Sequence, residues 1–114
     1  MKRDFTIYLT DILESAELIE GYTKDISEDE FYQSSEKQDA VLHRIQIIGE
    51  AAKKVPEEYR KRWSDIPWKE ISGMRDIIVH EYFGITMIMV WKVAVEDIPS
   101  IKLQIINILN SLNT

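Results

Sequence analysis

The sequence predicts an all-α protein, an up-and-down helical bundle of four to five helices in a single domain over residues 1–114. Apolar side chains recur at three- and four-residue steps in every long segment, which is the period of a helix with one buried face. No segment shows the alternation of apolar and polar residues that is typical of a β-strand. Four glycines and three prolines are too few breakers for a turn-rich sheet.

The first helix is expected over residues 4–22, and Gly21 with the polar residues after it marks its end. Its apolar stripe consists of Phe5, Tyr8, Ile12, Ala16 and Ile19. Ser27 and Glu30 then stand at the spacing of a capping box, in which each side chain accepts the other residue's backbone N–H. A short helical turn is therefore predicted to follow.

The longest helix is expected over residues 36–55, with a buried row of Val41, Ile45, Ile48, Ala52 and Val55. Pro56 lacks a backbone N–H and disfavours helical geometry in the residue before it, so this helix should stop there. Residues 57–63 can form a short helix after the proline. Gly49 costs about 1 kcal/mol relative to alanine inside a helix, which suggests that another helix packs closely against it.

The last third of the chain predicts further helices. Pro67, preceded by two cap candidates, begins a helix that should end near Gly84. Thr86 can cap the next helix, and Pro99 is expected to kink or break it. A final apolar row consists of Ile101, Ile105, Ile108 and Leu112.

Charge is distributed unevenly along this acidic chain, which has 14 basic and 20 acidic side chains and a net charge of −6. Residues 1–42 carry a net charge of −7, whereas residues 43–75 carry +3, from eight basic and five acidic side chains. The basic segment could form a face that binds phosphates. The alternative, and the more common case, is that helices with charges of both signs are simply solvated.

The composition excludes several classes of site. Without cysteine there is no disulfide scaffold, thiolate zinc site or cysteine nucleophile. Neither a signal peptide nor a membrane span is expected, and the predicted location is the cytoplasm. The sequence contains no Gly-rich phosphate loop and no His-Glu-x-x-His motif. With two histidines and no acidic cluster beside them, no metal and no cofactor are expected.

The side chains most suited to chemistry lie within residues 73–85, which contain Arg75, Asp76, His80 and Tyr82. On an ideal helix Arg75 and His80 point about 140° apart, whereas Arg75 and Tyr82 differ by only about 20°. One straight helix therefore does not direct all three at one point. Convergence requires the helix to end near His80, or a second copy of the chain related by a two-fold axis. A histidine near a helix end is more often structural than catalytic, so both readings remain open.

This segment resembles the Arg-x4-His-x-Tyr motif of HEPN-superfamily ribonucleases, specifically the HepT-like toxin branch. Further blocks resemble the same branch in the same order, at residues 47–53, 66–71, 82–85 and 90–99. The resemblance covers about residues 4–110.

The resemblance implies an α-helical homodimer that cleaves RNA without a metal ion at a composite cleft. By the same resemblance Arg75 and His80 are catalytic, and Asp76 is their supporting polar neighbour. The implied partner is a minimal nucleotidyltransferase antitoxin, which transfers AMP to Tyr82 and so silences the nuclease.

The chemistry of these residue types is consistent with that activity. RNA carries its own nucleophile, the 2′-OH. A histidine with a pKa of about 6.5 can accept or donate a proton at neutral pH. An arginine can hold a phosphate and stabilise the charge that develops on it.

Basic and acidic residues outside the motif are candidates for supporting roles. Glu50 could pair with Arg75 or Lys53, or it could be a plain solvated residue. Lys53, Arg60 and Arg62 are expected to contact RNA, either a transfer RNA or a messenger RNA.

Aromatic residues divide into two groups. Tyr59 and Trp63 flank a basic run and are the better candidates for touching RNA. Trp68 and Trp91 are expected in the core, and His43 at the surface or boundary.

The leading hypothesis is a ribonuclease toxin of a type VII-like toxin–antitoxin pair. The alternative is a non-catalytic helical dimer that binds a nucleotide or docks a minimal nucleotidyltransferase. A purely structural dimer is the third possibility, and the joint presence of Arg75, His80 and Tyr82 argues against it.

Overall fold

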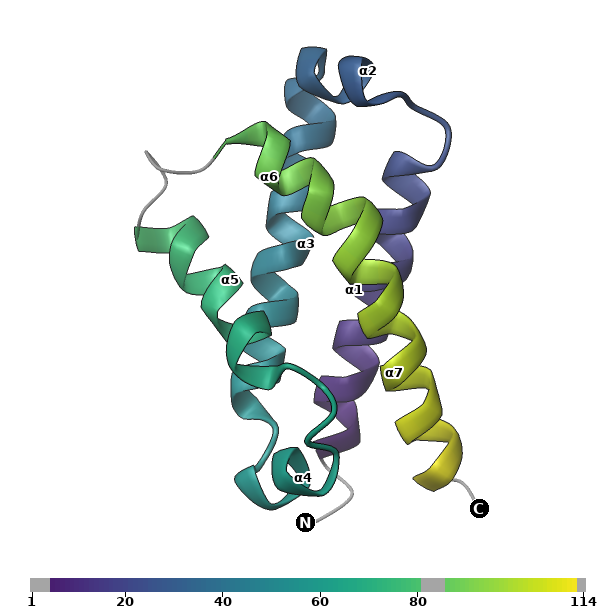
Figure 1. Ribbon diagram of the computed structural model, residues 1–114, viewed down its shortest axis with the longest axis vertical. Helices are drawn as coiled ribbons and strands as arrows, with labels where there is room; N and C mark the ends of the chain where they lie inside the picture. The colour runs from purple at the N-terminus through teal and green to yellow at the C-terminus, as the bar shows by residue number, and fades with distance from the viewer. Residues whose placement is uncertain (1–4, 81–85, 113–114) are drawn as a thin grey trace.

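A computed structural model of the chain shows four helical rods that run up and down along one long axis (Figure 1). The structure describes residues 5–80 and 86–112, with only the backbone described for residues 76–80. The rods are α1 (Thr6–Thr23), α3 (Ser35–Lys54), α5 (Trp68–His80) and a fourth that combines α6 (Met87–Lys92), the π-helical turn η3 (Val93–Asp97) and α7 (Ile98–Leu112). The predicted all-α bundle is confirmed.

Two short helices lie at opposite ends of the bundle (Figure 1). Helix α2 (Glu28–Gln33) connects α1 to α3, and α4 (Glu57–Arg62) connects α3 to α5. The antiparallel helices α1 and α3 form the centre, where α5 packs on α3 and α7 packs on α1. Helix α5 therefore lies on one side of the central pair and α7 on the other.

Side-chain caps define where helices begin. The backbone N–H of Glu30 donates to Ser27 Oγ at 3.1 Å, and the N–H of Ser27 donates to Glu30 Oε1 at 2.9 Å, so the predicted capping box is confirmed. Ser34 caps α3 by accepting a backbone N–H at 3.1 Å. Thr86 caps α6 as predicted, with a backbone N–H at 3.2 Å. The predicted helix end near Gly84 lies outside the described residues.

The apolar rows meet in one core. Ile12 of α1, Ile48 of α3 and Ile105 of α7 are completely buried. Burial of such side chains is the dominant stabilising contribution in a bundle of this kind. Within the described ranges, no helix is long and apolar enough to cross a membrane.

The chain stays helical through Pro99, where the sequence predicted a kink or break. The ring of a proline collides with the carbonyl four residues earlier, which here belongs to Val95. The turn before the proline has widened into the π-helical turn η3, in which the N–H of Ile98 donates to the carbonyl of Val93, five residues back. The wider turn accommodates the proline without ending the rod.

Candidate functional site

Helix α5 approaches α3 at backbone distance, and Gly49 makes this possible. A Cβ atom at position 49 would overlap the Cβ of Arg75 and lie 3.2 Å from both the Arg75 nitrogen and the Ile71 carbonyl oxygen. The close packing predicted from Gly49 is confirmed. Because the contact is made at Arg75 itself, α3 fixes the height and rotation of the motif arginine.

Glu50, the residue after this glycine, contacts the same arginine. Its Oε1 lies 4.0 Å from Arg75 Nε, and the side chains are 44% and 27% exposed respectively. Gln46, one turn earlier on α3, donates from Nε2 to Glu50 Oε1 at 3.3 Å. The carboxylate thus lies between an amide and a guanidinium, at ion-pair distance from Arg75 on the α3 side.

The rest of the motif is described only in part. Helix α5 carries Asp76 and His80 on helical backbone, with His80 five residues and about 7.5 Å of helix rise beyond Arg75. Tyr82, the predicted modification site, lies outside the described residues. In one copy of the chain, ideal helical geometry still separates positions 75 and 80 by about 140° around the axis.

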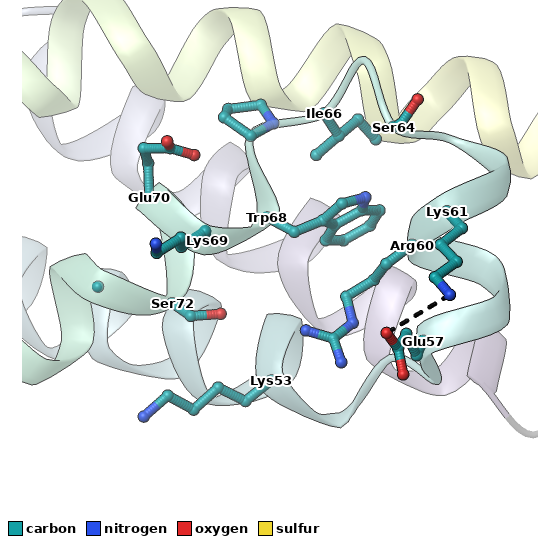
Figure 2. A pocket seen from close by; sticks show the side chains of 12 residues that line it. Lys53, Glu57, Arg60, Lys61, Ser64, Ile66, Trp68, Lys69, Glu70 and Ser72 are labelled. Atoms are coloured by element: carbon teal, nitrogen blue, oxygen red, sulfur yellow. Dashed lines mark ion pairs between the residues drawn. The ribbon is translucent and has the colours of Figure 1, made fainter.

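A cationic groove of about 800 Å³ lies between α4 and the start of α5, next to the end of α3 (Figure 2). Four basic side chains line it, against two acidic ones, Glu57 and Glu70. The basic residues are Lys53, Arg60, Lys61 and Lys69. Its apolar lining includes Ile66 and Trp68. Four of the eight basic side chains of residues 43–75 therefore gather in this groove.

The structure brings together two of the three residues that were expected to contact RNA. Lys53 and Arg60 line the cationic groove. Arg62 instead lies over the ring of Trp63, with 4.9 Å from its guanidinium carbon to the ring centre, and lines a separate hollow beside α7. The predicted set of three therefore does not form one surface, because Arg60 and Arg62 are two positions apart on a helix and point in different directions.

Tyr59, one of the two aromatic candidates for touching RNA, is instead a core residue. Tyr59 is only 9% exposed, and its ring stacks on Phe5 with 3.8 Å between ring centres and 7° between planes. Trp63 extends the same stack and is half-buried. These aromatic rings pack α4 against the beginning of α1. The basic residues between Tyr59 and Trp63 gave no sign of this packing role.

The predictions for Trp68, Trp91 and His43 are confirmed. Trp68 is 6% exposed, and its indole N–H donates to the Trp63 carbonyl at 3.1 Å. Trp91 packs against the core beside Phe31, with ring centres 5.3 Å apart. His43 is exposed on α3.

Sequence reasoning missed Lys69 and Ser72 as groove residues. Both stand on α5 before Arg75: Ser72 lies about 60° around the helix from Arg75, and Lys69 lies about 60° beyond Ser72. This spacing was visible in the sequence. Its meaning depended on where α4 lies, which only the tertiary structure shows.

Two described groups with shifted pKa values lie away from this region. A hydrogen bond from the Tyr32 hydroxyl to Glu28, within α2, raises the pKa of Tyr32 to about 12. A hydrogen bond from Lys102 of α7 to Glu20 of α1 raises the pKa of that lysine. Both contacts are structural. In the described part of the chain, no group of three or more His, Asp or Glu residues is placed to hold a metal ion.

Comparison with known proteins identifies the family. The model of the family "Ribonuclease HepT-like" matches residues 12–108. A Thermococcus cleftensis protein named "Probable ribonuclease HepT" is 43% identical over 90% of this chain and 93% of its own length. A Methanocaldococcus jannaschii protein named "Putative RNase" is 42% identical over 91% of this chain and 95% of its own length.

A second Methanocaldococcus jannaschii protein is 50% identical over 99% of this chain, which spans only 51% of that relative. Its name, "Gamma-glutamylcyclotransferase and putative RNase", describes a longer protein with two activities. No solved structure matches the chain significantly. The family match and the two relatives of similar length establish that this chain belongs to the HepT-like ribonuclease family.

Proposed function

We propose that this protein is a metal-independent endoribonuclease toxin whose activity a cognate nucleotidyltransferase silences. The observation that carries the proposal is the seating of Arg75 against Gly49 and Glu50 in a chain of the HepT-like ribonuclease family. An arginine that two helices hold in place is suited to binding a phosphate in one fixed orientation.

The proposed reaction needs only the RNA and the motif residues. His80 takes the proton of the 2′-OH, and the 2′ oxygen attacks the adjacent phosphorus. The bond from phosphorus to the 5′ oxygen breaks, and the leaving oxygen takes a proton from a second histidine. Arg75 stabilises the negative charge that develops on the phosphate, and Asp76 supports the pair. The products carry a 2′,3′-cyclic phosphate, which can open to a 3′-phosphate, and a 5′-hydroxyl.

The proposed active form is a homodimer with one composite cleft. The motif positions 75 and 80 face about 140° apart on one helix. In a two-fold dimer, Arg75 of one copy and His80 of the other can face the same cleft. Helix α5 lies on one side of the central pair, where it packs on α3 (Figure 1). This position supports the arrangement, because the side of α5 that faces away from α3 is available to a second copy of the chain. Mixing inactive Arg75→Ala and His80→Ala chains is expected to restore a small part of the activity, because the mixed dimer keeps one Arg75 and one His80 in the shared cleft, and water must replace the second histidine as the acid. No restoration under conditions of subunit exchange would contradict a shared cleft.

The proposed silencing acts on Tyr82. AMP on this tyrosine would add bulk and a negative phosphate two positions from His80, and that phosphate would compete with RNA for Arg75. The partner is a minimal nucleotidyltransferase, and the pair acts in the cytoplasm. Tyr82→Phe is expected to remain toxic when the partner is co-expressed.

The deciding experiment is cleavage of total RNA by the purified chain in EDTA. His80→Ala is the test variant, and His43→Ala is the matched control because His43 is exposed and lies on α3. We expect cleavage by the wild type and by His43→Ala, but not by His80→Ala of equal helical content. Mass spectrometry of Tyr82 distinguishes a silenced sample from an inactive one. No cleavage with an unmodified Tyr82 would favour a non-catalytic dimer that binds a nucleotide or the nucleotidyltransferase.

A further inference from the structure

We propose that the cationic groove between α4 and α5 is a phosphate-binding subsite, which anchors the RNA backbone beside the cleavage site. The inference rests on the proposed ribonuclease function for its choice of ligand. It assigns the groove a ligand class, the phosphates of a single RNA strand, and it names Arg60 and Ser72 as the central contacts.

Two buried polar atoms in the groove indicate what it binds. Arg60 Nε and Ser72 Oγ are buried and have no hydrogen-bond partner within the described part of the chain. Buried polar groups are nearly always hydrogen-bonded, so such atoms call for a ligand, a water or an ion. Figure 2 shows the Ser72 hydroxyl and the Arg60 guanidinium pointing toward each other from α5 and α4. Both can donate, which matches the oxygen atoms of a phosphate.

The charges around these atoms also favour an anion. Lys53 and Lys69 line the groove from α3 and α5. The third lysine, Lys61, lies 3.7 Å from Glu57, so one of the two acidic residues already has a cationic partner. The groove therefore remains basic although the chain as a whole is acidic.

The groove lies about one helical turn from Arg75 and Glu50, on the same two helices. Ser72 precedes Arg75 by three residues on α5, and Lys53 follows Glu50 by three residues on α3. Because α3 and α5 run in opposite directions, both steps lead toward α4, by about 4.5 Å of helix rise each. A strand with one phosphate at Arg75 can therefore continue into the groove.

The groove is suited to backbone contacts rather than to base recognition. Trp68, the aromatic residue in its lining, is 6% exposed and offers no open ring face for stacking. Contacts to phosphates position a nucleic acid without reading its sequence. The anchor is thus expected to increase affinity for longer strands and to leave the choice of cleaved base unchanged.

The test is binding of a fluorescent ten-nucleotide strand without 2′-hydroxyl groups, which the enzyme cannot cleave. Arg60→Gln and Ser72→Ala are the test variants, and Arg62→Gln is the matched control because it lies on the same helix but lines another hollow. We expect Arg60→Gln to weaken binding several-fold, and to lower the slope of log affinity against log salt by about 0.7 for one lost phosphate contact. Arg62→Gln should leave both values unchanged.

Several outcomes would overturn the subsite. Equal weakening by Arg60→Gln and Arg62→Gln would indicate general electrostatic attraction. No binding by the wild type, or unchanged binding by Arg60→Gln, would show that the groove holds no strand. Displacement of the strand by poly-glutamate as efficiently as by unlabelled strand would point to an acidic protein as the ligand.

The same measurement separates this inference from the proposed function. If the chain binds the strand through Arg60 but cleaves no RNA, the phosphate-binding subsite is supported and the ribonuclease proposal is contradicted. Cleavage of a dinucleotide and of a ten-nucleotide RNA gives a second readout. Arg60→Gln should raise KM for the longer RNA and leave cleavage of the dinucleotide unchanged.

Discussion

The outer helix α7 packs on α1 and buries large isoleucines, whereas the outer helix α5 meets α3 at a glycine. Ile101, Ile105 and Ile108 of α7 are buried in the core. At Gly49 the backbones come close enough that Arg75 packs directly on α3. The first kind of contact buries apolar area and stabilises the fold. The second kind fixes the position of a polar side chain, so it affects the candidate site as well as stability.

The largest expected effect is on the α7 side. Ile105→Ala should lower the free energy of unfolding by about 2–5 kcal/mol, because it removes a completely buried side chain and leaves a cavity. Urea unfolding measures the change. Leu103→Ala, at a position on the same helix that is 63% exposed, should change it by less than about 0.5 kcal/mol. Similar losses for both variants would contradict the packing described for α7.

The next effect is on catalysis, on the α5 side. Arg75→Ala should reduce kcat for RNA cleavage by about 10²–10³-fold, the loss typical of a removed transition-state donor. Its unfolding free energy should fall much less than that of Ile105→Ala, because Arg75 is partly exposed. Lys92→Ala, an exposed cation on α6, is the control and should retain activity. Full activity of Arg75→Ala would remove this residue from the mechanism.

Gly49→Ala should affect both properties. The added methyl group overlaps Arg75 and forces α5 away from α3, at a cost of about 1–3 kcal/mol. RNA cleavage should fall as well, since the arginine moves with its helix. Gly21→Ala, where the new Cβ meets nothing within 4 Å, should be neutral or stabilising by up to about 1 kcal/mol. If the Gly49→Ala chain is as stable and as active as the wild type, the close contact at Gly49 matters neither for folding nor for the position of Arg75.

The smallest expected effect concerns the polar contact between α7 and α1. Lys102 Nζ lies 2.7 Å from Glu20 Oε1, and this hydrogen bond raises the pKa of Lys102 above its ordinary value of 10.5. A raised lysine pKa means that the contact stabilises the fold fully below pH 10.5 and loses its effect as the pH rises through the higher folded value. The small stability difference between wild type and Lys102→Met should therefore be constant from neutral to mildly basic pH and shrink only above that range. Urea unfolding across this pH series checks it, and a difference that disappears already near neutral pH would contradict the contact.

The sequence by itself determined the helices, because their signals are local. Apolar periodicity, the Ser27 capping box and Pro56 each act within a few residues, and the observed helices follow them. The response to Pro99 was less predictable. A proline inside a helix can be relieved by a break, a kink or a widened turn, and the packing of α7 on α1 is consistent with the widened turn seen here.

The candidate site was predictable only in its residue types. The motif and Glu50 could be named from the sequence, but the contact between Glu50 and Arg75 depends on the register of α3 against α5, which Gly49 sets. In the same way, the sequence placed Arg60 and Arg62 in one basic run, and only the docking of the short helix α4 separated them. Adjacent turns of one helix are fixed by local geometry, whereas the faces that two helices present to each other are decided by how their side chains pack.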